Sequence, residues 1–228
     1  MKPPGVRYVA VIAPVREVIL AGSADLAWWR ERLGREALHP YDDGGRASLL
    51  LSATAYSFRG LPFREFSVSV AVSERADGAT HDGVYLAQAY NSSRLLAFTE
   101  QLFFRTPYVP AGIQVTERPP VTMAVSRGEV GLFAASLAEG TPRANVEAQE
   151  WEGPIFLPGG KAVFYARLAG ATDVYPFTTA DTVSIHPDEN DEALRQLVEC
   201  GFVGREWRVR ATATHARTRT HRRNTLSF

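Results

Sequence analysis

The stretch DGVYLAQAYNSSRLLAFTEQLFFRTPYVP, residues 82–110, decides the fold because it joins a strand, a short helix and a proline turn with little polar filler. Gly83 to Tyr90 has the apolar alternation of a strand. Asn91-Ser92-Ser93 breaks this pattern, and either serine can accept a hydrogen bond from a free backbone N–H at the start of a helix. Leucines and phenylalanines then recur at helical spacing and predict one apolar face. The helix must end by Thr106, since Pro107 disfavours the α conformation in the residue before it.

Two strands are expected before this stretch, Ala47 to Phe58 and Arg64 to Val72. The second has large apolar residues on one face and small or polar ones on the other, including Glu65, Ser67 and Ser69. A face of that kind either meets solvent or lines a cavity. Glu65 is therefore either an exposed strand glutamate or a residue at a cavity mouth.

Short strands at close spacing make up most of the remaining chain. They are predicted at residues 6–15, 113–117, 121–127, 130–137, 145–156, 161–168 and 173–177, with a last one from 206. One helix is expected from a cap at Ser23 to Leu33, and another is opened by His186-Pro187. Many strands and few helices predict a single β-rich α+β domain over residues 1–228, with a curved antiparallel, barrel-like sheet.

Composition limits the classes of function. The chain has 25 basic and 25 acidic side chains, so its net charge gives no reason to expect nucleic acid, a membrane surface or a strongly ionic substrate. A single cysteine, Cys200, excludes an internal disulfide and a zinc site of several thiolates. No membrane-spanning apolar run and no secretory signal occurs, which makes the cytoplasm the expected location.

Several chemically suggestive groups have plainer explanations. The C-terminal residues 217–228 contain a basic run of Arg217, Arg219, Arg222 and Arg223. These arginines begin at strand spacing between threonines, so we expect an exposed edge strand with a frayed basic tail rather than a nucleic-acid contact. His81-Asp82 is discounted as a catalytic or metal pair because neighbours on an extended chain point in opposite directions. No nucleotide, nucleophile-elbow or zinc-protease motif occurs, and no metal or cofactor is expected.

The run Glu100-Gln101-Leu102-Phe103-Phe104-Arg105-Thr106-Pro107-Tyr108, preceded by Phe63-Arg64-Glu65 in a strand, resembles the central motif of the acetoacetate decarboxylase superfamily. Decarboxylating members carry Gly-Arg-Glu and, a few residues later, Pro-Lys-Lys. Here the proline matches and the lysines do not, so the chain is closer to a sister branch with Pro-Tyr after the helix and Phe-x-Glu in the earlier strand. The resemblance covers roughly residues 45–170 and implies the curved, barrel-like sheet of that superfamily around a small-molecule pocket.

The missing lysines bear on the chemistry that the resemblance implies. In acetoacetate decarboxylases a lysine amine forms a Schiff base with the substrate ketone. This chain has only Lys2 and Lys161, and Tyr108 and Val109 stand where the paired lysines would be. Lys2 lies near a terminus that we expect to be loose, and Lys161 follows a Pro-Gly-Gly turn. Schiff-base decarboxylation is therefore not expected unless Lys161 reaches the pocket.

The resemblance also implies a set of pocket residues, namely Glu65, Glu100, Arg105 and Tyr108. Arg105 has two donors for a carboxylate or enolate oxygen, Tyr108 can donate to a carbonyl oxygen, and Glu65 can act as acid or base if burial raises its pKa. The expected ligand is a keto acid or polyketide-like molecule, and the expected chemistry is that of a lyase, isomerase or cyclase without a Schiff base. The alternative is a binding or sensor protein that has the pocket without the chemistry. Assembly into a homo-oligomer stays open.

Overall fold

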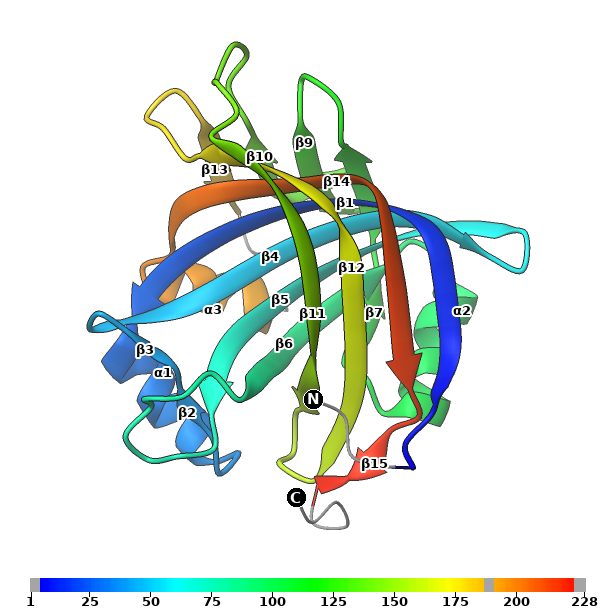
Figure 1. Cartoon of the computed structure of the whole chain (residues 1–228), viewed down its shortest axis with the longest axis vertical. Helices are drawn as coiled ribbons and strands as arrows, with labels where there is room; N and C mark the ends of the chain where they lie inside the picture. Colours follow the sequence, from blue (N-terminus) through cyan, green and yellow to red (C-terminus); the bar gives the residue numbers. More distant parts are fainter. Residues whose placement is uncertain (1–4, 187–190, 224–228) are drawn as a thin grey trace.

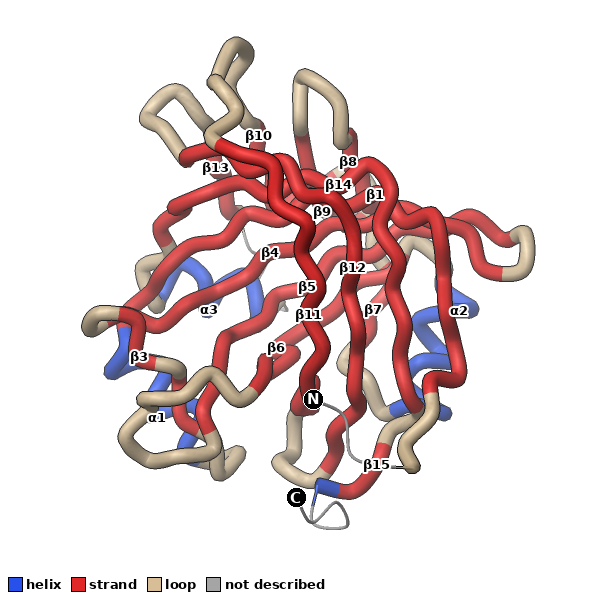
Figure 2. Tube along the Cα trace, viewed as in Figure 1, coloured by secondary structure: helices blue, strands red, loops and turns tan. Residues whose placement is uncertain are grey.

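The chain forms a strongly curved sheet with a few short helices at its margins (Figures 1 and 2). The computed structural model describes residues 5–186 and 191–223. The main sheet has 11 strands. Its path in space is β2 (His39–Pro40), β5 (Leu61–Ser73), β4 (Arg46–Phe58), β1 (Tyr8–Asp25), β14 (Val203–Thr218), β12 (Ala162–Pro176), β11 (Asn145–Leu157), β6 (Gly83–Asn91) and β7 (Tyr108–Pro110), while β3 (Asp42–Asp43) pairs with β4 and β15 (His221–Arg222) with β12.

Strand β6 closes the main sheet into a ring of strands because it pairs with β5 on one side and with β11 on the other. Gly83 permits the close approach to β11, since a Cβ atom there would lie 2.5 Å from the carbonyl oxygen of Pro154. The pairings of β6 with β11 and β7 are parallel. The predicted β-rich fold with a curved sheet and few helices is confirmed, but the sheet is mixed rather than purely antiparallel. The helical connection from β6 to β7 supplies the crossover that a parallel pair requires.

A second, four-stranded sheet packs against the first. Its order is β13 (Thr182–Ile185), β10 (Val130–Ser136), β9 (Thr122–Arg127) and β8 (Gly112–Thr116). The predicted meander of three strands is present as β8, β9 and β10, and β13 joins it from later in the chain. The rings of Phe66 on β5 and Phe133 on β10 lie 5.0 Å apart between the two sheets.

This packing gives the two faces of β5 different roles. Phe66, Val68 and Val70 are buried in the core that includes the second sheet. Glu65 and Ser67, which point to the other side, line a cavity inside the curved main sheet. Of the two alternatives that the sequence left for the polar face, the structure therefore shows the cavity.

Strand β1 is much longer than the predicted strand over residues 6–15. Pro14 lies at a register shift between Ile12 and Val15, where a residue without a backbone N–H is tolerated. The strand continues to Asp25, so the predicted cap at Ser23 is wrong. Asp25 caps helix α1 (Leu26–Gly34) instead, and its carboxylate accepts a hydrogen bond from the backbone N–H of Trp28.

The predicted helix after β6 is present and is capped by Ser93, whose hydroxyl accepts from the N–H of Leu96. It consists of α2 (Arg94–Thr99) and a π-helical turn, η1 (Glu100–Phe104), and it ends at Arg105 in the left-handed region with φ 56°. Most of its predicted apolar face does not enter the core: Leu95, Leu102 and Phe103 are exposed, while Leu96 and Thr99 are half-buried and line the cavity described below. Packing inside the chain therefore does not explain the three exposed side chains.

The C-terminal prediction needs correction. Strand β14 runs to Thr218 and β15 follows, so residues 217–223 are not a frayed tail. Residues 224–228 lie outside the described residues. The predicted separate strand at 173–177 is the end of β12.

The last helix, α3 (Glu192–Glu199), begins after the Asp191 cap and not at His186. Pro187, the predicted start of this helix, lies outside the described residues, as does Lys2 at the N-terminus. Within the described ranges no helix is long and apolar enough to cross a membrane.

Candidate functional site

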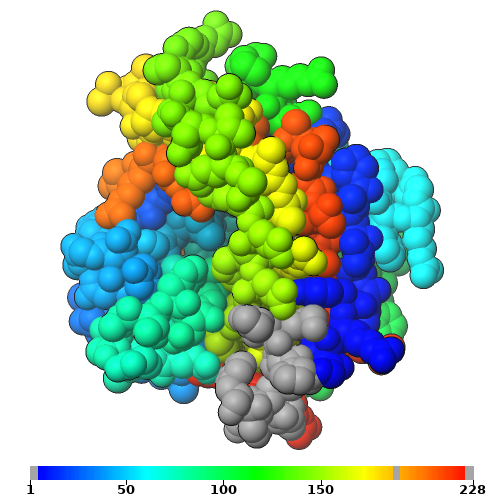
Figure 3. All heavy atoms as spheres, viewed as in Figure 1, coloured from blue at the N-terminus to red at the C-terminus, as the bar shows by residue number. Residues whose placement is uncertain are grey.

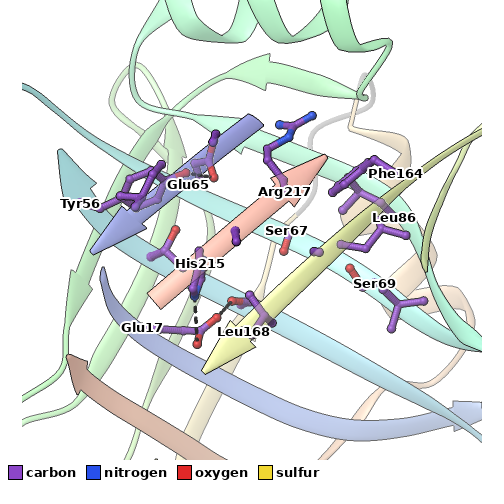
Figure 4. Close-up of a pocket in the computed structure, with 18 of the residues that line it drawn as sticks. Glu17, Tyr56, Glu65, Ser67, Ser69, Leu86, Phe164, Leu168, His215 and Arg217 are labelled. Carbon is purple, nitrogen blue, oxygen red and sulfur yellow. Dashed lines mark hydrogen bonds and ion pairs between the residues drawn. The ribbon is translucent and has the colours of Figure 1, made fainter. Parts of the chain in front are cut away.

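The curved main sheet encloses a cavity of about 440 Å³. In Figure 3 the molecular surface is hollowed beside β11, whose residues Gln149 and Trp151 line the cavity. Much of the lining is apolar, including Leu86, Phe164 and Leu168 (Figure 4). The polar groups are gathered on neighbouring strands of the sheet.

One row of polar residues crosses five neighbouring strands on the cavity side. Strand register places them in the order Asn91 on β6, Glu65 on β5, Thr54 on β4, Glu17 on β1 and Arg210 on β14. All of them line the cavity. Neighbouring strands are about 4.8 Å apart, so the backbones at Glu65 and Glu17 are separated by about 10 Å.

Glu65 is the first polar centre of the cavity. Its Oε2 accepts a hydrogen bond from the Tyr56 hydroxyl, and its Oε1 accepts one from Asn91 Nδ2 at 3.0 Å. Burial raises the pKa of the Glu65 carboxyl group, and the nearby charge of Glu100 raises it further. The Tyr56 hydroxyl opposes this shift because it donates to the ionised form, but burial outweighs it. The carboxyl group therefore keeps its proton to a higher pH than an ordinary glutamate.

Two tyrosine hydroxyls lie next to this carboxyl group. Burial raises the pKa of both Tyr56 and Tyr108 well above the usual value for tyrosine, and a negative charge on Glu65 raises both further. Both phenols consequently stay protonated at neutral pH. Because Tyr56 donates its single O–H to Glu65, Tyr108 is the phenol that remains to donate to a carbonyl oxygen in the cavity.

Glu100 and Arg217 form a second polar centre. Nη1 of Arg217 donates to both Glu100 carboxylate oxygens, at 2.8 and 2.7 Å, and Thr106 Oγ1 donates to Glu100 at 2.9 Å. The guanidinium lies between the rings of Phe104 and Phe164, with centroids at 4.4 and 4.6 Å. Its Nε and Nη2 atoms are buried without a hydrogen-bond partner. These are donors with unused hydrogen-bonding capacity at the cavity wall.

The third polar centre is built on Glu17. Its carboxylate accepts hydrogen bonds from Arg210 Nη1 and, at 3.1 Å, from Ser52 Oγ, and Nε2 of His215 lies 3.5 Å from its Oε2. The other donors of Arg210 reach Thr172 Oγ1 and Gln149 Oε1, both at 2.7 Å. Burial alone would raise the pKa of Glu17, but His215 and Arg210 outweigh it and lower the pKa to about 2. Glu17 is therefore an ionised, buried carboxylate.

The structure brings together three of the four residues predicted for the pocket. Glu65, Glu100 and Tyr108 line the cavity, whereas Arg105 is exposed and does not. The left-handed turn that follows η1 sets the direction of the backbone at Arg105. Lys161 is also exposed and absent from the cavity wall. No group of three or more metal-ligating residues of the kind His, Cys, Asp or Glu occurs in the described part of the chain.

Sequence reasoning missed several polar residues of the cavity. These are Glu17, Tyr56, Arg210, His215 and Arg217. Glu17 carried a usable signal, since it is a charged residue at the edge of the apolar run from Val18 to Leu20. The residues from β14 carried none, because alternation of arginine with threonine is also the pattern of an exposed strand.

Comparison with known proteins places the fold. The sequence matches no protein-family model and no curated protein. Among solved structures, acetoacetate decarboxylase from Legionella pneumophila is similar with a TM-score of 0.65, 10% identity, and coverage of 97% of this chain and 93% of that chain. Another acetoacetate decarboxylase structure gives a TM-score of 0.63 at 11% identity, covering 96% of this chain and 90% of the other.

The enduracididine biosynthesis enzyme MppR is also similar. Its complex with the condensation product of pyruvate and imidazole 4-carboxaldehyde has a TM-score of 0.58 and 10% identity, with coverage of 97% of this chain and 90% of that chain. The chain therefore has the acetoacetate decarboxylase-like fold. At such low identity the likeness concerns the fold alone.

Proposed function

We propose that the chain binds a small organic molecule in the cavity and uses Glu65 to exchange a proton with it. The observation that carries the proposal is the enclosed Glu65 carboxyl group, whose pKa is raised and which lies beside the hydroxyls of Tyr56 and Tyr108. A protonated carboxyl group in such a place can donate to a ligand oxygen and can take the proton back. Acids with perturbed pKa values cluster at functional sites, and a cleft that holds one is a candidate site.

The ligand that suits this cavity is a keto acid or polyketide-like molecule. The cavity of about 440 Å³ lies within the range of about 300–1,000 Å³ that small-molecule sites occupy. Its apolar wall suits a carbon skeleton, and the Tyr108 hydroxyl and the protonated Glu65 carboxyl group suit a carbonyl oxygen. A ligand carboxylate would pair with the unpartnered Nε and Nη2 of Arg217 after the Phe104 ring turns aside.

The chemistry that follows is enolisation. Donation to a carbonyl oxygen makes the neighbouring C–H bonds more acidic, and lyase, isomerase and cyclase reactions can begin from the resulting enol. A lysine Schiff base has no part in the proposal, since Lys161, the one lysine among the described residues, is exposed and does not line the cavity. The fold neighbours support carbonyl chemistry by analogy only, through the decarboxylase and the pyruvate-derived product bound to MppR.

A second candidate function is non-catalytic binding. It is favoured by the pairing of the cavity arginines: Arg208 with Glu206, Arg210 with Glu17 and Arg217 with Glu100. With these charges paired inside the protein, a largely apolar molecule could be held without any reaction.

Exchange of carbon-bound hydrogen for deuterium separates the two candidates. The protein is incubated in D₂O with pyruvate, 2-oxobutanoate and levulinate, and deuterium in the carbonyl compound is followed by ¹H NMR, while binding is followed by native mass spectrometry. We expect protein-dependent exchange that falls about 100-fold or more in Glu65→Gln, with binding retained. Glu129→Gln, at an exposed turn outside the cavity, is the matched control and should exchange like the wild type. Binding without exchange would favour the second candidate, and absence of both would refute the proposal.

A further inference from the structure

His215 faces the same cavity as Glu65, from β14 (Figure 4). Its Nε2 lies 3.5 Å from Glu17 Oε2, and this nitrogen is buried without a hydrogen bond. The side chain is 20% exposed and lines the cavity. A ligand would therefore meet Nδ1, the other ring nitrogen.

The surroundings of His215 direct the ring toward one carboxylate. On the neighbouring strands its register partners are the apolar Ile12 of β1 and Leu168 of β12. Glu17 is held in place by Arg210 and Ser52, so the carboxylate that faces Nε2 has little freedom to move. A fixed carboxylate at one ring nitrogen favours the tautomer with the proton on that nitrogen and leaves the other as an acceptor.

We propose that His215, oriented by Glu17, is the base that removes a proton from a carbon acid in the cavity, an enolisable ketone or keto acid whose carbonyl oxygen is held by Glu65. This inference rests on the proposed function and assigns the second partner of the proton transfer. Glu17 acts through the imidazole and is a positioning residue. The contact of 3.5 Å is longer than a good hydrogen bond and can shorten when a ligand fills the cavity.

The proposed step balances in atoms and charge. Nδ1 of His215 takes the proton from the carbon next to the carbonyl group, and the C–H electron pair forms the C=C bond of the enol. The carbonyl oxygen takes the proton of the Glu65 carboxyl group. The result is an enol, an imidazolium and a Glu65 carboxylate, and the reverse step restores all three groups. In D₂O the imidazolium proton is replaced by deuterium, which is then returned to carbon.

The arrangement of the strands makes such a pair possible. Glu65 and Glu17 lie in one polar row, and the backbones at these two residues are about 10 Å apart at ordinary strand spacing. Both residues and His215 line the concave side of the curved sheet, where side chains converge. The two ends of the pair also differ in the required way, since burial favours the protonated form of Glu65 while His215 and Arg210 favour the ionised form of Glu17.

The test uses the full chain with pyruvate, 2-oxobutanoate and levulinate in D₂O. His215→Ala should lower the exchange rate about 100-fold or more, should still bind the compound in native mass spectrometry, and should regain exchange when free imidazole is added. His186→Ala removes an exposed histidine outside the cavity and should exchange like the wild type. Exchange at the wild-type rate in His215→Ala would overturn this inference without contradicting the role proposed for Glu65. Absence of exchange in the wild type would overturn the proposed catalysis, and this inference with it.

A measurement without ligand tests the positioning by Glu17. In ¹⁵N NMR of histidine-labelled protein, the neutral ring of His215 should show a protonated Nε2 and an unprotonated Nδ1. Glu17→Gln should reduce that tautomer preference, and His215→Ala identifies the signal. The opposite tautomer in the wild type would contradict the proposal even where exchange is observed.

Discussion

Replacement of Glu17 by glutamine should cost stability in a pH-dependent way. Glu17 is almost completely buried and bonded to Arg210, so the variant keeps the shape of the side chain and loses only its charge. The pKa of Glu17 falls from an ordinary 4.5 to about 2 in the folded protein. A difference of that size corresponds to about 3 kcal/mol, at about 1.4 kcal/mol per pKa unit.

The sign follows from the lowered pKa. The stabilising contribution of Glu17 is fully present above pH 4.5, the unfolded value, and is lost as the pH falls toward the folded value of about 2. The wild type should therefore exceed Glu17→Gln by about 3 kcal/mol in free energy of unfolding at pH 7, and by roughly half of that at pH 3. In thermal unfolding the pH 7 difference corresponds to about 6–12 °C in a chain of this size.

Urea unfolding followed by tryptophan fluorescence gives both values, since Trp29 and Trp207 are fully buried reporters. Glu150→Gln is the matched control: Glu150 pairs with Arg167 at 2.8 Å, but both side chains are about half exposed. Its loss should cost at most about 1 kcal/mol. An equal difference between the wild type and Glu17→Gln at pH 7 and pH 3 would refute the assignment of Glu17 as a buried, ionised group.

Three further predictions concern the cavity and the helix beside it. Tyr56→Phe should raise the pKa of Glu65 further, because it removes a donor to the ionised carboxylate, and a ¹³C NMR titration of the glutamate carboxyl carbons measures the change. Ser93→Ala should destabilise the protein by about 1 kcal/mol in urea unfolding, since its hydroxyl caps α2 at the N–H of Leu96. Arg105→Ala should leave ligand binding and deuterium exchange at wild-type levels, because Arg105 is exposed outside the cavity. A loss of binding or of exchange would show that Arg105 belongs to the site.

The local parts of the fold were predictable from the sequence. The alternation of β4 and β5, the strand before Asn91 and the serine cap of α2 follow from residues that are close in the chain. The cavity did not follow in the same way. The polar face of β5 has the same residue pattern whether it meets solvent or lines a cavity. The curvature of the sheet, which encloses the cavity, depends on pairing with strands that lie more than 100 residues later in the chain.

The two arginines near the site show why site residues are harder to predict than strands. Arg105 lies in the motif that carries the resemblance. It follows the π-helical turn η1, its own backbone is left-handed, and its side chain is exposed. Arg217 lies in a segment that reads as a basic tail. Its burial comes from Glu100 and the rings of Phe104 and Phe164, all distant in sequence. Burial of this kind is a property of tertiary contacts and leaves no local pattern.

Native mass spectrometry of the protein purified from its own host lysate tests most directly whether the cavity holds a small molecule. Ser67→Trp fills the cavity from β5, and Ser57→Trp, on the exposed part of β4, is the matched control. We predict that the wild type and Ser57→Trp retain an organic molecule of the same mass and that Ser67→Trp has lost it. A bare protein mass in all three, or the same bound mass in Ser67→Trp, would contradict the account.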